Sequence, residues 1–173
     1  AFADTGVSPD DPAMQRAMVF LQRVQMQEKG ADGKVINAMP YAKGSTQGGF
    51  IYATASNPQT LGQGQSFAGT IEETLSTGEK KSMLRAYGSV SYAGFKSYLF
   101  AGLKKDDPRV QAVLDFCRRH YTLSENPNFG SEGQYYYYVA FARALSAAQL
   151  DTIDAVADGK TTPRNWRADL INQ

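Results

Sequence analysis

The chain has 173 residues, of which 42% are hydrophobic, and this is enough for one folded domain with an apolar core. Its 18 basic and 17 acidic side chains leave a formal charge of +1, so no strong field would attract nucleic acid or an anionic membrane surface. A single cysteine, Cys117, excludes an internal disulfide framework and a cysteine-rich zinc module, and no run of about 18 apolar residues could span a bilayer. We therefore expect no nucleic-acid partner and no transmembrane segment, and the composition indicates no particular compartment.

A short pattern occurs twice and gives the first indication of the architecture. Residues 6–15, GVSPDDPAMQ, return as residues 102–111, GLKKDDPRVQ, with the glycine, both aspartates, one proline and the glutamine in register. In each copy the glycine suits the left-handed residue after a helix, the second aspartate can cap the next helix, and the proline fits its first position. Each copy therefore predicts a corner between two helices.

The first helix is predicted over residues 12–27. Its apolar side chains recur every three or four residues, which is typical of a helix with one buried and one solvated face. This stripe consists of Met14, Ala17, Met18, Leu21 and Val24.

Residues 30–80 have a different composition. They contain nine of the sixteen glycines, together with many Ser, Thr, Gln and Asn residues. We expect a long loop there, anchored to the core by the apolar residues 49–52, and loops of such length are usually functional or mobile.

Two later segments, 89–103 and 134–148, carry aromatic and small residues on nearly all sides and very few charges, which predicts helices buried on most sides. A second one-sided helix is expected between them, over residues 108–121, with Cys117 in its apolar stripe. Residues 150–165 are polar and predict a connection, after which a new helix is expected from Trp166.

Nearly all-apolar helices thus alternate with one-sided helices. This alternation favours a two-layered ring, in which inner helices are covered by outer ones. The sequence therefore predicts an all-α fold of the α/α-toroid type, built from antiparallel inner and outer helical hairpins. Residues 1–173 are expected to form a single domain that is part of such a ring.

Several segments resemble a known family. Residues 20–25, FLQRVQ, followed by residues 48–50, GGF, resemble a degenerate Gln-to-Trp repeat of squalene cyclases and protein prenyltransferases that carries an insertion. Residues 87–94, YGSVSYAG, are similar to bacterial prenyltransferase or squalene-oxidase repeat proteins, as are the segments GLKKDDPRV, YTLSENPNFG and GQYYYY. The resemblance implies a terpenoid cyclase-like α/α toroid. Since family members are longer, it also implies that the chain is a fragment.

The resemblance to cyclases implies a catalytic acid at the start of an inner helix, where an Asp-rich motif protonates an alkene. Such an acid must be kept protonated by its surroundings, which is why carboxyls cluster there. The corresponding residues here, 89–92, read SVSY, and their hydroxyls cannot supply that acid. Asp151 and Asp154 lie in a polar segment and are expected to be cap or surface residues. No catalytic residue is predicted.

Protein prenyltransferases bind zinc through an Asp-x-Cys pair and a distant histidine, and Asp115, Cys117 and His120 offer a partial match. Residues two apart on a helix point about 200° away from each other, so Asp115 and Cys117 cannot share a metal on an intact helix. We expect Cys117 to be a buried thiol, since free cysteine behaves as a small core residue. No metal and no other cofactor is predicted.

Aromatic residues at the start of the predicted inner helices are the remaining candidates for a site. In the cyclases such rings line the cavity and stabilise carbocations. The residues predicted to line a pocket are Tyr92, Phe95, Tyr135 and Tyr136. The glycine-rich residues 62–69 are expected to fold over or beside this pocket.

The sequence thus predicts a repeat toroid without an evident catalytic centre that binds an apolar, isoprenoid-like ligand or a protein partner. Two alternatives stay open, and with them the question whether the chain is an enzyme. One is an active isoprenoid cyclase of the squalene-hopene type, or a prenyltransferase, whose catalytic residues lie in missing repeats. The other is an enzyme acting on polysaccharides, which would need a pair of carboxylates within reach of each other.

Overall fold

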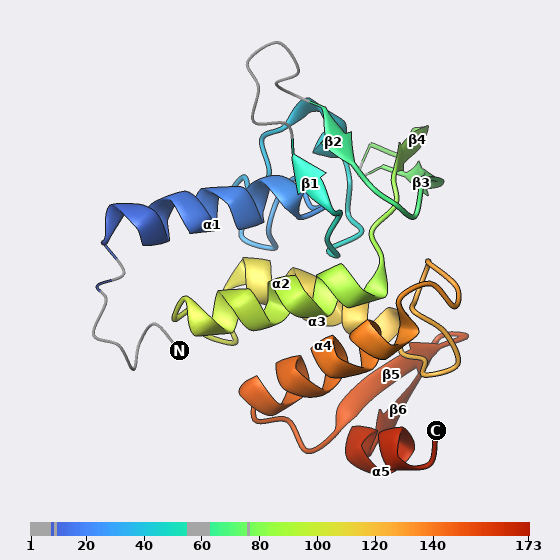
Figure 1. Cartoon of the computed structure of the whole chain (residues 1–173). Coiled ribbons are helices and arrows are strands. Elements are labelled where there is room, and N and C mark those ends of the chain that lie inside the picture. The colour runs from blue at the N-terminus through green and yellow to red at the C-terminus, as the bar shows by residue number, and fades with distance from the viewer. Residues whose placement is uncertain (1–7, 9, 55–62, 76) are drawn as a thin grey trace.

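The computed structural model describes residues 8, 10–54, 63–75 and 77–173. In this part of the chain, five α-helices are combined with three two-stranded antiparallel sheets (Figure 1). The helices are α1 (Pro12–Val24), α2 (Gly88–Phe100), α3 (Pro108–Arg119), α4 (Gln134–Ala147) and α5 (Trp166–Ile171), with a short 3-10 helix, η2, at Pro40–Ala42. The strands are β1 (Ala53–Thr54), β2 (Gly64–Gln65), β3 (Thr70–Thr74), β4 (Lys80–Leu84), β5 (Ile153–Ala157) and β6 (Lys160–Arg164).

The prediction of an all-α toroid built only from helical repeats is wrong, because β-hairpins occupy two segments that were expected to be loops. Strands β3 and β4 pair within the predicted long loop, and β5 pairs with β6 within the predicted polar connection. The second hairpin closes at Asp158 and Gly159, both with positive φ, which is the Asp-Gly signal of a tight hairpin turn. The chain is therefore a mixed α/β domain.

The predicted positions of the four long helices are confirmed to within a few residues at each end. The aspartates of the repeated pattern act as expected, because the Asp11 carboxylate accepts from the Ala13 N–H at 2.7 Å and the Asp107 carboxylate accepts from the Arg109 N–H at 2.9 Å. Gly102 follows α2 with a φ of +88°, as a left-handed residue at a helix end should. Gly6, its counterpart in the first copy, lies outside the described residues.

Helices α2 and α4 lie side by side in the core and run in the same direction (Figure 1). Near their starts, the Tyr92 ring contacts the rings of Tyr137 and Phe141 at centroid distances of 5.7 and 5.1 Å. Near their ends, Phe100 of α2 and Ala147 of α4 line the same hollow. Helix α3 contributes the core residues Val110, Val113, Leu114, Phe116 and Cys117.

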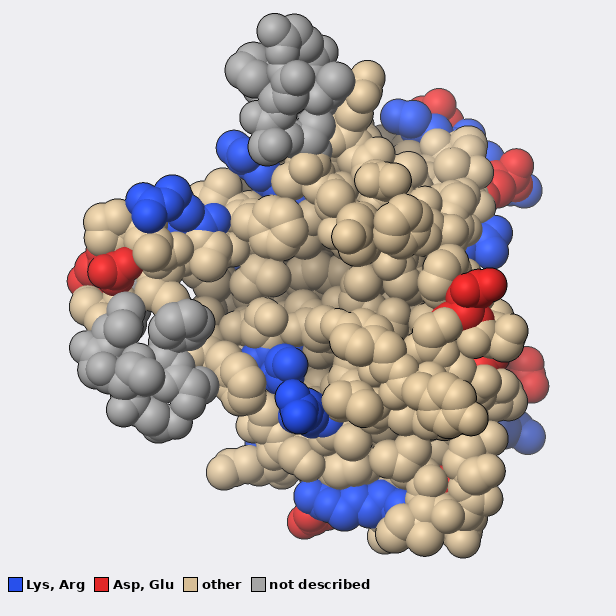
Figure 2. All heavy atoms as spheres, viewed as in Figure 1, with Lys and Arg blue, Asp and Glu red and all other residues tan. Residues whose placement is uncertain are grey.

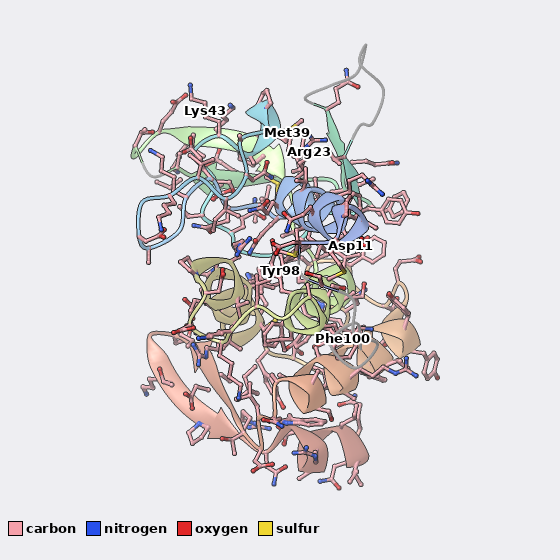
Figure 3. All side chains as sticks on the ribbon, turned by 90° about the vertical axis from the view of Figure 1, so that its left-hand side faces the viewer. Asp11, Arg23, Met39, Lys43, Tyr98 and Phe100 are labelled. Atoms are coloured by element: carbon pink, nitrogen blue, oxygen red, sulfur yellow. The ribbon has the colours of Figure 1, made fainter. Side chains whose placement is uncertain are left out.

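The segment between α1 and α2 is fixed to this core by buried amide side chains. The Gln25 Nε2 group donates to the carbonyl oxygens of Gly48 and Arg109, both at 2.9 Å, and its Oε1 atom accepts from the Tyr98 hydroxyl at 2.8 Å. Figure 3 shows Tyr98 in the layer between α1 and α2. Asn37 adds further bonds, since its Nδ2 group donates to the Arg23 and Gln25 carbonyl oxygens at 2.9 and 2.7 Å. Much of the predicted loop is therefore anchored structure.

The end of the described chain packs on α4. The Trp166 Nε1 group donates to the Leu150 carbonyl oxygen at 2.6 Å, and its ring lies edge-on to the Phe141 ring at 5.9 Å. The helix predicted from Trp166 is confirmed as α5. None of the helices in the described part of the chain is long and apolar enough to cross a membrane.

Candidate functional site

The four residues predicted to line one pocket do not share a surface. Tyr92 and Phe95 of α2 are each 1% exposed and lie in the core, whereas Tyr135 and Tyr136 at the start of α4 are 86% and 58% exposed. In the segment expected to cover the pocket, the Phe67 ring lies on the Tyr52 ring, and Gly64 of β2 lies close to the side chains of Tyr41, Ile51 and Leu84. Gly62, where this cover was expected to begin, lies outside the described residues.

Buried Tyr92 and Cys117 form an inert part of the core. Burial, together with the Cys117 thiol beside it, raises the pKa of the Tyr92 hydroxyl well above its ordinary value. Burial likewise raises the pKa of the Cys117 thiol, so this group stays protonated at neutral pH and is a poor nucleophile. The predicted burial of Cys117 is confirmed.

Several of the residues weighed as catalytic or zinc-binding have structural roles. The Asp115 carboxylate pairs with Arg118 at 2.9 Å on the surface of α3, while Cys117 is fully buried. In the SVSY segment, the Ser91 hydroxyl donates to the Tyr87 carbonyl oxygen at 2.7 Å and accepts from the Phe50 N–H at 2.9 Å. Within the described residues, no three His, Cys, Asp or Glu side chains gather to hold a metal ion.

One end of the α2–α4 pair carries a cluster of aromatic residues, which we call the aromatic end: Tyr52, Phe67, Tyr87, Phe129 and Tyr136. The Tyr87 ring lies on the Phe129 ring at 4.8 Å, and the Tyr52 ring lies on the Phe67 ring at 4.3 Å. Burial raises the pKa of the Tyr87 hydroxyl to about 12, with smaller contributions from the nearby hydroxyls of Tyr52 and Tyr136. The aromatic end therefore joins the start of α2 to the start of α4.

The other end of the same helix pair has a hollow of about 580 Å³ between the two helices, which we call the basic hollow. It is lined by Lys96, Phe100, Ala142, Arg143, Ser146 and Ala147. The lining includes the small side chains of Ala142, Ser146 and Ala147 from the last turns of α4, together with the Phe100 ring. Figure 3 shows Phe100 on the side of α2 that faces α4.

The charged side chains on these two helices are all basic. Helix α2 contains one cation, Lys96, and α4 contains one, Arg143, whereas neither helix contains an acidic residue. The Lys96 amino group lies 6.0 Å from the centre of the Phe100 ring. Neither cation forms an ion pair with any carboxylate of the described residues. The single cations of the two helices thus line one hollow.

The surface that connects the two ends is largely uncharged. Figure 2 shows it from the side on which α1, α2 and α4 face the viewer, with basic atoms near the middle of the lower half and acidic atoms only toward the edges. Val139 of α4, 49% exposed, lies between Tyr136 and Arg143 at helical spacing, so the three side chains follow one stripe. We call the stripe and the two ends together the α2–α4 face.

Two further hollows have fewer features of a binding site. A polar cleft of about 540 Å³ includes Tyr121, Arg164 and Asp169. There, Arg164 holds the Asp169 carboxylate at 2.9 and 3.0 Å and lowers its pKa, and the Tyr121 hydroxyl donates to the same carboxylate at 2.6 Å. The charges in this cleft neutralise each other. A shallow hollow of about 440 Å³ lies beside Tyr135 and Tyr136 and reaches Leu170 of α5.

Lys96 and Arg143 were not among the predicted site residues. A signal for them was present, because each is the single charged residue of an otherwise uncharged helix. Their meeting in one hollow depends on the parallel packing of α2 and α4, which joins residues far apart in the sequence.

Comparisons with protein-family models, with curated proteins and with solved structures gave no match for this chain.

Proposed function

We propose that the chain is a binding module that takes up an apolar ligand on its α2–α4 face, with the basic hollow as the central site. The observation that carries this proposal is the hollow itself. Its volume of about 580 Å³ lies within the usual range of small-molecule sites, which is roughly 300–1,000 Å³. The ring of Phe100, the methyl groups of Ala142 and Ala147, and the aliphatic stems of Lys96 and Arg143 give it a mainly apolar lining.

The resemblance to squalene-cyclase and prenyltransferase repeat proteins implied a toroid that the structure does not have, so the proposal rests on the hollow and not on that resemblance. Catalysis would need an acid or metal ligands outside the candidate site, so the active cyclase or prenyltransferase stays a prediction. An enzyme acting on polysaccharides has less support, since helices α2 and α4 contain no acidic residue that could form a carboxylate pair at the candidate site.

A titration with dodecanol, followed by isothermal calorimetry, tests the proposal. We expect binding to wild-type protein and at least a roughly tenfold loss for Ser146→Trp, because the indole ring would fill the hollow from an exposed position. Ser82→Trp on the exposed strand β4 is the matched control and should bind like wild type. Equal affinities in all three proteins would contradict the proposal.

A protein partner is the second candidate, and the exposure of Tyr135 favours it. A ring that is 86% exposed is more open than a small ligand would require, and tyrosines are enriched where proteins dock. A photo-crosslinking residue placed at Tyr135 should then capture one dominant partner in cells, whereas the same residue at Ser82 should not. Similar patterns from both positions would contradict a docking role for Tyr135.

A further inference from the structure

We infer that the ligand of the basic hollow carries an anionic head, a carboxylate or a phosphate, on its apolar chain. This inference rests on the proposed uptake of an apolar ligand and adds the class of that ligand: a soluble, single-chain anionic amphiphile. The two cations, the apolar lining between them and the adjoining stripe each contribute a separate part of the argument.

The charges of the hollow favour an anion. Lys96 and Arg143 converge on it from two helices that have no acidic residue, and neither cation is paired with a described carboxylate. A cationic head would be repelled by both cations, and a neutral head would gain no charge–charge attraction from them. An anionic head is thus the one that complements the hollow.

The geometry of the two cations suits an oxyanion. The planar guanidinium of Arg143 can donate two parallel hydrogen bonds to a carboxylate or phosphate, whereas the Lys96 amino group acts as a point charge. The Ser146 hydroxyl lines the same hollow and offers a further donor. These donors come from α2 and from two successive turns of α4, so a bound oxyanion would bridge the helices.

The tail has a path along the same face. From Arg143, exposed Val139 and Tyr136 follow toward the aromatic end at spacings of four and three residues, which places them on one side of α4. Seven residues of helix span about 10 Å, comparable to most of a medium-length alkyl chain. The head would therefore lie at Lys96 and Arg143 and the tail along the stripe.

Three probes with one tail and different heads test the inference: dodecanoate and dodecyltrimethylammonium, each below its micelle concentration, and dodecanol below its solubility limit. We expect wild-type protein to bind dodecanoate roughly tenfold more tightly than dodecanol, and the trimethylammonium compound most weakly. Lys96→Gln and Arg143→Gln should each weaken dodecanoate binding severalfold more than they weaken dodecanol binding. Lys160→Gln on the exposed strand β6 removes the same charge away from the face and should behave as wild type.

The outcomes separate this inference from the proposed function. Equal binding of dodecanoate and dodecanol, unchanged in both glutamine variants, would overturn the anionic head but leave an apolar ligand. Failure of all three probes to bind would overturn both. Phosphatidylcholine vesicles with and without phosphatidylglycerol form a further arm, and binding to the anionic vesicles without binding of dodecanoate would replace the soluble ligand with a membrane surface. Thermal unfolding of each variant shows that it is folded.

Discussion

The helical region formed by α2, α3 and α4 is stabilised in a different way from the segment between α1 and α2. In the helical region, rings such as Tyr92, Tyr137 and Phe141 pack against one another, and the contacts recur at helical spacing. In the segment, single polar side chains such as Gln25 and Asn37 hold distant backbone groups together. The first kind of structure leaves a periodic pattern in the sequence, and the second does not.

Removal of a central ring from the helical region should have the largest effect. Phe141 is fully buried and contacts Tyr92, Tyr121, Tyr137 and Trp166. Phe141→Ala should lower the free energy of unfolding by about 4 kcal/mol in urea denaturation, because it leaves a cavity. Val139→Ala, two residues earlier on the exposed side, is the control and should cost about 0.5 kcal/mol or less.

Loss of the Gln25 amide should also lower the free energy of unfolding, because it leaves polar groups of the segment between α1 and α2 unpaired. Gln25→Leu leaves two carbonyl oxygens and the Tyr98 hydroxyl without their partner, and we expect a cost of about 3 kcal/mol. The double variant Gln25→Leu with Tyr98→Phe should recover about 1 kcal/mol, since the orphaned hydroxyl is gone. Gln27→Leu, which removes only a local bond to the Lys29 carbonyl oxygen, is the control. An unfolding free energy of Gln25→Leu equal to that of the control would show that the segment does not depend on this amide.

This contrast explains what could be predicted from the sequence. The four long helices follow from apolar periodicity and from the aspartate caps, which are local signals. The anchoring of residues 25–50 depends on amide contacts to groups as distant as Arg109, and composition alone suggested a loop. The β5–β6 hairpin had a local signal, Asp158-Gly159, which the prediction of a polar connection did not use.

The site was predictable only in part. Aromatic character at the start of α4 led to Tyr135 and Tyr136, which are exposed, yet the same reasoning chose Tyr92 and Phe95, which lie in the core. An aromatic-rich helix does not reveal from its sequence which side a neighbouring helix covers, because rings suit both core and surface sites. Tyr92 is buried because α3 and α4 both pack against α2.

The two aspartate caps offer a comparison within the repeated pattern. Asp107 caps α3 and also binds the Arg109 side chain at 2.7 and 2.8 Å, whereas Asp11 only caps α1. We expect Asp107→Ala to cost about 2 kcal/mol and Asp11→Ala about 1 kcal/mol in urea denaturation. Equal costs would mean that the ion pair adds nothing to the cap.

The same ion pair predicts a dependence on pH. The hydrogen bonds from Arg109 hold the pKa of the Asp107 carboxyl below its ordinary value of 3.8 in the folded protein. A lowered folded pKa stabilises the protein above the ordinary value, and this contribution is lost as the pH falls from 3.8 through the folded pKa. Wild-type protein should therefore lose more stability than Asp107→Ala in this acid range. If the free energy of unfolding fell by the same amount with pH in both proteins, this effect would be excluded.

The smallest expected effect concerns the β5–β6 hairpin, which lies against the helical region without belonging to its pattern. Gly159 has a φ of +71°, and a Cβ atom there would meet no atom within 4 Å, so Gly159→Ala would be disfavoured by its backbone conformation alone. We expect a cost of about 1 kcal/mol, and Asp158→Asn should be nearly neutral because Asn-Gly also suits this turn. Hydrogen exchange should show faster opening of β5 and β6 in Gly159→Ala with α2 and α4 unchanged. Faster exchange in α4 as well would mean that the hairpin supports the core through buried Ile153 and Trp166. The hairpin and the helical region would then unfold as one unit.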